Sequence, residues 1–207
     1  MKSVILAAAL LSLTACAAMP NNGAEPFAKS SDWRKVATDS DRQRLREWRT
    51  SFVRGLDQAR KSGHAAEIAA EGRLLEPDAG IGPSPIPNGP YKCRVIKVGA
   101  KSEGLLDYIA YPAFDCRIQQ EKDLQSLSKL GGSQRHVGLL FAADTMRQVF
   151  LGTLVLGNEQ RAMQYGHDPD RDLAGWVERI GDRRWRLLLP YPKYESTIDV
   201  VELTPAN

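Results

Sequence analysis

The sequence has few cysteines, few histidines and little net charge. Its 207 residues include three of each of these two types, and 28 Lys and Arg stand against 25 Asp and Glu, a formal charge of +3. Such a balance gives little support for a nucleic-acid-binding surface, which needs a clear excess of positive charge. The histidines lie far apart and no His-Glu-x-x-His or Cys-x-x-Cys occurs. We therefore expect no metal site and no cofactor.

Complete catalytic motifs are also missing. Gly132-Ser133-Gln134-Arg135 lacks the second glycine of the Gly-x-Ser-x-Gly elbow. Val98-Gly99-Ala100-Lys101-Ser102 lacks the upstream glycine of a phosphate-binding loop. The sequence therefore favours a protein that is not an enzyme.

The one long hydrophobic run is Val4–Leu13, and it is shorter than the roughly 20 apolar residues that a membrane span needs. With Lys2 before it, this run predicts a signal peptide. The segment Leu13-Thr14-Ala15-Cys16 resembles the lipobox of bacterial lipoproteins. That resemblance implies cleavage after residue 15 and lipid on Cys16. The alternative is ordinary cleavage near Ala18.

The residues after Cys16 extend this interpretation. Ala17 in place of Asp favours, by the sorting rule of lipoproteins, the outer membrane, with the protein facing the periplasm. Residues 16–31 are small and polar, with Pro20, Gly23 and Pro26, and they predict a flexible tether.

The two remaining cysteines, Cys93 and Cys116, form an even pair in an oxidising compartment, so we expect a disulfide bond. Both fall on the apolar phase of segments that alternate apolar and polar residues, which places the bond under a sheet. The closed loop is of a length worth about 3 kcal/mol of stability.

Residues 32–76 predict a helical hairpin. Thr38 and Asp41 have the spacing of an N-terminal cap, and a helix follows to about Ser62, with a second helix over His64–Leu75. The first helix carries a continuous apolar stripe, made of Leu45, Trp48, Phe52, Leu56 and Ala59. Between residues 32 and 61 there are nine basic and five acidic residues, a local charge of +4. This excess predicts either a patch for anionic headgroups or an acidic partner, or an ordinary solvated helix face.

Residues 77–90 are rich in Pro and Gly and predict an extended connector over the surface. From Tyr91 the apolar period is two, and about eight strands follow at hairpin spacing without helices between them. We therefore predict an α+β protein whose residues 91–207 form a lipocalin-like antiparallel β-barrel, with a β-sandwich as the alternative. Gly138, Gly152 and Gly175 lie inside strands, where we expect bends.

Two places offer candidate binding residues. A turn at Gly181-Asp182 would place Trp176 and Glu178 on the core face of a hairpin with Trp185. Glu178 would then be a ligand-binding acid, or it would reach the rim or pair with an arginine.

The second place is the polar loop with Tyr165, His167 and Asp168, at one end of the predicted barrel. His167 there has the chemistry of a general base or a metal ligand, and loops at the mouth of a barrel are where binding groups gather. The alternative is that Asp168, followed by Pro169, only shapes a turn.

From about Trp33 to its C-terminus the chain resembles the bacterial family called domain of unknown function DUF4893. The segments that carry the resemblance are Asp32-Trp33, Gly89-Pro90-Tyr91-Lys92-Cys93, Tyr111-Pro112-x-x-x-Cys116, Gly131-x-Ser133-Gln134-Arg135, Val149-Phe150-Leu151-Gly152 and Arg184-Trp185-Arg186-Leu187-x-x-Pro190. The family brings no known activity, so no functional residue is carried over. A tethered, disulfide-linked barrel is also similar in architecture to the inhibitor lipoproteins of the periplasm.

The expected function is therefore that of a membrane-tethered binding or inhibitor-type module of the cell envelope. Its partner would be another envelope protein, bound by the barrel loops, or a small apolar ligand in the interior. The alternatives are an envelope hydrolase with a site near His167 and Glu178, and a structural lipoprotein whose arginine-rich helix contacts cell-wall polymer.

Overall fold

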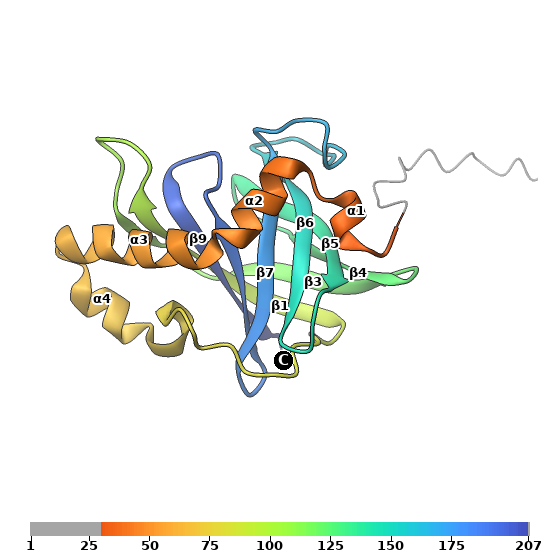
Figure 1. The fold of residues 1–207 in the computed structure, drawn as a ribbon, viewed down its shortest axis with the longest axis horizontal. Coiled ribbons are helices and arrows are strands. Elements are labelled where there is room, and N and C mark those ends of the chain that lie inside the picture. The colour runs from red at the N-terminus through yellow and green to blue at the C-terminus, as the bar shows by residue number, and fades with distance from the viewer. Residues whose placement is uncertain (1–29, 207) are drawn as a thin grey trace, which may run out of the picture.

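In a computed structural model, which describes residues 30–206, eight antiparallel strands form a closed barrel (Figure 1). Each strand of the barrel pairs with the next along the chain, and β1 closes it by pairing with β9 over Tyr91–Ala100. The barrel confirms the predicted fold and rules out the sandwich. The strands are β1 (Gly89–Ala100), β2 (Tyr108–Ala110), β3 (Phe114–Glu121), β4 (Leu124–Lys129), β5 (Gln134–Ala142), β6 (Arg147–Leu156), β7 (Asp172–Gly181), β8 (Arg184–Pro190) and β9 (Ser196–Pro205).

The ninth strand, β2, lies outside the closed circle. The first half of β1 pairs with β3, whereas Ile96, Lys97 and Val98 in its second half pair with β2. The disulfide bond between Cys93 and Cys116 joins β1 to β3 inside the barrel, with Cα atoms 5.8 Å apart, as predicted from the strand phase.

Glycines inside the strands, where the sequence predicted bends, let two strands approach each other around an aromatic ring. Gly138 on β5 faces Gly152 on β6, and the ring of Phe150 lies against both. A Cβ on Gly138 would stand 2.4 Å from the carbonyl oxygen of Leu151 and 2.7 Å from Phe150. No side chain fits at this position without moving the backbone, so the two strands approach each other only because both residues are glycine.

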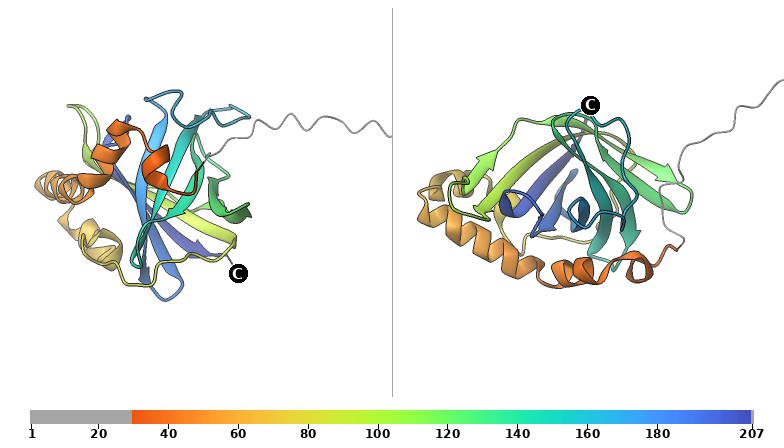
Figure 2. Two further views of the ribbon diagram at one scale, coloured as in Figure 1. Left: turned by 45° about the vertical axis from the view of Figure 1, so that its right-hand side comes forward. Right: turned by 90° about the horizontal axis from the view of Figure 1, so that it is seen from above.

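Helices precede the barrel and cover its outer surface along one side (Figure 2, right). The predicted stripe is confirmed, because Leu45, Phe52, Leu56 and Ala59 are buried. The three on α3, Phe52, Leu56 and Ala59, pack against outward side chains of β1, β8 and β9. Ile96 and Val200 are among these. The helices are α1 (Trp33–Val36), α2 (Asp39–Arg46), α3 (Trp48–Lys61), α4 (Ala65–Ala70) and the 3-10 turn η1 (Gly72–Leu75).

The helical hairpin is more broken than predicted. Thr38 caps α2 by accepting a hydrogen bond from the Asp41 backbone, as expected, but the first helix is interrupted at Glu47, where ψ rises to 7°. The predicted second helix, His64–Leu75, is also split, since Gly72 has a φ of +52° that an α-helix does not accommodate.

The Pro/Gly-rich connector contributes to the core, contrary to the expectation of a purely surface path. Ile86 is buried in the barrel interior. The indole of Trp185 donates to the Ser84 carbonyl at 3.1 Å, and the Tyr91 hydroxyl donates to the Pro87 carbonyl at 2.8 Å. The connector therefore covers one end of the barrel, which we call the connector end. The opposite end, where β1 and β4 finish and β5 and β9 begin, is called the loop end.

The β7–β8 hairpin has a different register from the one predicted. Glu178 faces Arg186 and Trp176 faces Leu188, because a bulge lies between Arg179 and Gly181. The turn residues are Asp182 and Arg183, and Arg183 itself has a φ of +51°. The shift of one residue moves alternate side chains to the other face of the sheet. Trp185 consequently lies in the interior, whereas Trp176 lies on the outer surface of the barrel.

Candidate functional site

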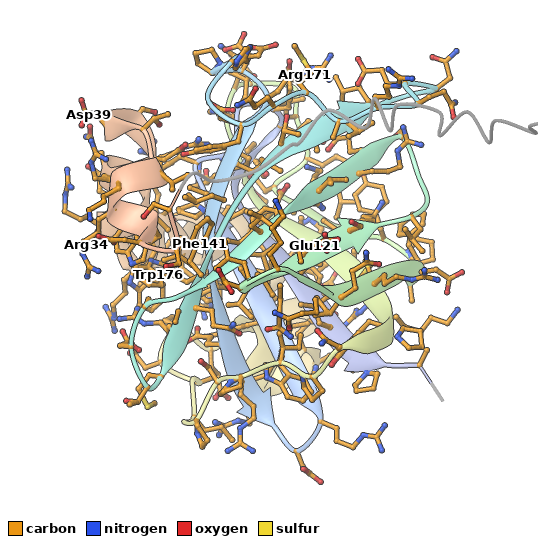
Figure 3. All side chains as sticks on the ribbon, turned by 90° about the vertical axis from the view of Figure 1, so that its right-hand side faces the viewer. Arg34, Asp39, Glu121, Phe141, Arg171 and Trp176 are labelled. Carbon is orange, nitrogen blue, oxygen red and sulfur yellow. A yellow bond between two sulfur atoms is a disulfide. The ribbon has the colours of Figure 1, made fainter. Side chains whose placement is uncertain are left out.

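Trp176 and Glu178, predicted to face the core, lie on the outer surface instead. The indole of Trp176 donates to the Leu45 carbonyl at 2.9 Å and packs edge-on against Trp33, so it holds the first helices on the barrel (Figure 3). Glu178 pairs with Arg186, Oε1 to Nη2 at 2.7 Å, under the residues that follow η1. The guanidinium of Arg186 also donates to four carbonyls, those of Arg73, Leu74, Glu76 and Pro77. Trp176 and Glu178 are thus both held in structural contacts. Of the alternatives predicted for Glu178, the structure shows the ion pair with an arginine.

The loop before β7 is likewise built from structural contacts. Tyr165 donates to the buried carboxylate of Asp41 and accepts from the Thr38 backbone at 3.1 Å, which ties the loop to α2. Asp168 accepts from the Asp170 backbone at 3.0 Å through its side chain, so it shapes the turn, as the alternative interpretation held. His167 is exposed.

The structure does not bring His167 and Glu178 together. His167 precedes the start of β7 at Asp172, and Glu178 lies six residues further along this strand. At ~3.3 Å per residue, roughly 20 Å separates that strand start from Glu178. Cys16 lies outside the described residues.

A polar pocket at the loop end of the barrel is the strongest candidate site. Below it the interior is filled by apolar side chains, including Tyr91, Ile118, Phe150 and Trp185. Above them lies a cavity of about 100 Å³ whose lining includes Lys97, Phe114, Lys129, Gln134, His136 and Glu195. A volume of this size holds about three water molecules or one small organic acid. We call it the loop-end pocket.

Lys97 is one of two buried lysines in the pocket wall, and it is fully paired. Its Nζ lies 2.9 Å from Oδ2 of Asp199, the residue opposite on β9, and 3.2 Å from Oε2 of Glu195. Ser196 donates to the other oxygen of Asp199. Burial alone would disfavour the charge, but the two carboxylates outweigh it and raise the pKa of Lys97. Lys97 is therefore a permanent cation within a closed ion-pair network.

Lys129 is buried to a similar degree but has different neighbours. Its Nζ donates to the carbonyls of Gly131 at 2.6 Å and Gln134 at 2.9 Å, and it lies 3.7 Å from the centre of the Phe114 ring. Among residues 30–206, no carboxylate pairs with it. Burial, together with the charges of Arg135 and Lys97, lowers the pKa of Lys129 to about 8.

The turn above Lys129 depends on a glycine. Gly132 has a φ of +85°, and a Cβ there would stand 2.7 Å from the Lys129 amine. A larger residue would therefore be strained and would press on the ammonium group. The turn leaves Gly132 and Ser133 exposed at the edge of the pocket, where solvent reaches it.

His136 completes the polar wall. The residue is 3% exposed, and its Nδ1 has no hydrogen-bond partner among residues 30–206. Burial, and then the nearby charges of Lys97 and Lys129, lower the pKa of His136 to about 3. The ring is therefore neutral at physiological pH, with one N–H donor and one acceptor nitrogen. An unsatisfied buried ring nitrogen of this kind costs free energy unless a ligand or water meets it.

The loop-end pocket can bind and orient a small polar molecule. It offers an ammonium group without a counter-ion, a neutral imidazole and an aromatic ring. Lys97, Lys129 and His136 were not predicted as site residues. The available signal was that each continues the interior phase of its strand, Lys97 two residues after Val95 and Lys129 two residues after Leu127.

Residues 30–206 hold neither a candidate metal site nor a membrane-spanning helix. Over this range no group of three or more His, Cys, Asp or Glu side chains is placed to hold a metal ion. None of the helices in this part of the chain is long and apolar enough to cross a membrane.

Comparison with known proteins gives a family and no activity. The model of the family described as domain of unknown function (DUF4893) matches residues 33–203, so the chain belongs to this family. No curated protein and no solved structure matches it at a significant level. Two segments that carry the family resemblance, 111–116 and 131–135, contribute to the loop-end pocket.

Proposed function

We propose that this member of the DUF4893 family is a lipid-anchored binding protein of the bacterial cell envelope, and that its barrel binds a small carboxylate or similar monoanion in the loop-end pocket. The anchor would be attached at Cys16 and would hold the protein on the periplasmic face of the outer membrane. The lipobox-like segment Leu13-Thr14-Ala15-Cys16 supports this location. The Cys93–Cys116 disulfide agrees with an oxidising compartment.

The observation that carries the proposal is the state of Lys129. Its ammonium group is buried in the wall of a cavity, and its partners are two carbonyls and a ring. Partial negative charges of this kind solvate a cation less well than a carboxylate does. An anion in the cavity would stabilise the positive charge that burial disfavours, and a hydrogen bond from or to His136 would orient the anion.

The pocket favours a small anion over the apolar ligand expected from the sequence. The apolar part of the interior is occupied by protein side chains, with Phe150, Trp185 and Leu187 almost completely buried. The remaining space is about 100 Å³, and polar and apolar groups contribute about equally to its lining. This volume limits the size of the ligand. Besides the carboxylate carbon, the ligand can have about three or four non-hydrogen atoms, its two oxygens included.

An NMR titration of the purified full-length chain with acetate, propionate and benzoate tests the proposal. We expect acetate and propionate to shift the amide signals of residues 129–136, and benzoate to be excluded by size. Lys129→Gln should abolish the shifts. Lys92→Gln removes the same charge from an exposed position on β1 and should leave them unchanged. Equal shifts in the two variants, or none in the wild type, would contradict the proposal.

A further inference from the structure

The helices α1, α2 and α3 form a continuous band along one side of the barrel (Figure 2, right). The inner face of this band is accounted for by packing, since Trp33, Leu45, Phe52 and Leu56 are buried against the strands. The outer face faces solvent throughout. We call it the outer helical face, defined as the exposed side chains of residues 33–61.

The outer helical face carries an excess of positive charge. Nine basic and five acidic residues fall within residues 32–61. Two of the exposed acids are already paired with arginines on the same face, Asp39 with Arg42 and Asp57 with Arg60. On the outer helical face, within the described residues, four exposed cations have no ion pair, no side-chain hydrogen bond and no aromatic contact: Lys35, Arg46, Arg54 and Lys61. A fifth, Arg34, lies over the Trp33 ring, 4.4 Å from its centre.

Arg46, Arg54 and Lys61 lie on the consecutive helices α2 and α3, and Lys35 lies on α1. Arg54 and Lys61 are seven residues apart on α3, which places them two turns apart on the same face. Both border the same open surface depression on α3, together with Arg49. Arg46 stands at the end of α2, immediately before α3 begins. The electrostatic potentials of these cations add together toward a flat, negatively charged partner.

The chain enters the structure next to this face. The described part begins at Ser30, two residues before the cap of α1. Cys16 lies 14 residues earlier, and 14 residues span at most ~50 Å. A lipid on Cys16, as proposed above, would keep the start of the outer helical face, at residue 33, near the bilayer. The charge pattern itself is independent of the anchor and of the loop-end pocket.

We propose that the outer helical face docks on an anionic bilayer surface through Lys35, Arg46, Arg54 and Lys61. A cation close to an anionic membrane strengthens binding about fivefold. Removing three of the four should therefore weaken binding about 100-fold. Docking on this face would turn the side of the barrel toward the membrane and leave the loop-end pocket open to the periplasm.

Co-sedimentation with vesicles tests the docking surface. The chain carries Cys16→Ser, so that no attached lipid contributes, and the vesicles are phosphatidylcholine with or without phosphatidylglycerol. We expect binding only when phosphatidylglycerol is present, and its loss as salt is raised. The variant R46Q/R54Q/K61Q should bind about 100-fold more weakly.

The control variant R117Q/R161Q/R183Q lowers the net charge equally on the barrel, at exposed positions without ion pairs in the described residues. It should bind the vesicles as well as the parent chain does. Equal weakening in both variants would show that net charge alone is responsible and would overturn the proposal. Failure of anionic vesicles to bind while soluble poly-glutamate binds would assign the face to an acidic polymer instead, and would also overturn it.

Discussion

Glu178 and Arg186 face each other across strands β7 and β8 as an ion pair on the outer surface of the barrel, buried under the chain that follows η1. Arg186 is 0% exposed, and its guanidinium donates hydrogen bonds to four backbone carbonyls in addition to the carboxylate. One guanidinium group therefore fixes the end of the helical segment and the start of the connector to the barrel.

Removing the carboxylate should destabilise the fold strongly. Glu178→Ala leaves a buried guanidinium without its counter-ion, a change that typically costs about 3–5 kcal/mol of unfolding free energy. Chemical denaturation of the two proteins measures it. Asp78→Ala breaks the exposed pair with Arg49 and serves as the control, with no expected change in the denaturation midpoint. A Glu178→Ala midpoint equal to that of the control would show that the pair is not needed.

The contact of Gly138 with Gly152 should tolerate no side chain. Gly152→Ala places a Cβ 2.3 Å from the Val137 carbonyl and 2.6 Å from Phe150, so β5 and β6 must separate. Overpacking of this kind costs about 1–3 kcal/mol or more. Thermal unfolding checks the value, with Gly131→Ala as the control, because a Cβ there would make only an ordinary contact with Phe114 at 3.5 Å. Little loss of stability in Gly152→Ala would mean that the strands are further apart than described.

Because of His136, the free energy of unfolding should fall at acidic pH. Its pKa is about 3 in the folded protein and near 6.5 when exposed, so the unfolded state takes up the proton first as pH falls below 6.5. This contribution is complete above pH ~6.5 and is lost at up to about 1.4 kcal/mol per pH unit as pH falls toward 3.

His136→Gln does not titrate and retains hydrogen-bonding atoms, so its unfolding free energy should depend less on pH over this range. Denaturation of both proteins at several pH values between 7 and 4 gives the two curves. Other groups titrate equally in both, and the difference between the curves isolates residue 136. Parallel curves would contradict the buried, neutral state of this ring.

Features set by local periodicity could be predicted from the sequence. The alternation around Cys93 and Cys116 predicted both the strands and the disulfide, because every second residue along a strand lies on the same face whatever the rest of the fold does. The stripe from Leu45 to Ala59 gave the buried face of the helices for the same reason.

Features that depend on pairing could not be predicted in this way. The β7–β8 register was wrong because the bulge at Arg179 and Gly181 has no clear local signature, and one inserted residue exchanges the two faces. The loop-end pocket was missed because Lys97, Lys129 and His136 come from three strands, and only closure of the barrel brings them together.

The pKa of Lys129, measured with and without a bound carboxylate, tests the central claim most directly. A nitrogen-15 NMR titration of the lysine side chain should give a pKa near 8 in the free protein, as burial dictates. An anion in contact with the ammonium group favours the charged form, so saturating propionate should raise this pKa by about one unit or more, and binding should weaken as pH rises above 8. A Lys129 pKa that is unchanged by propionate would contradict the account of the barrel as an anion-binding protein.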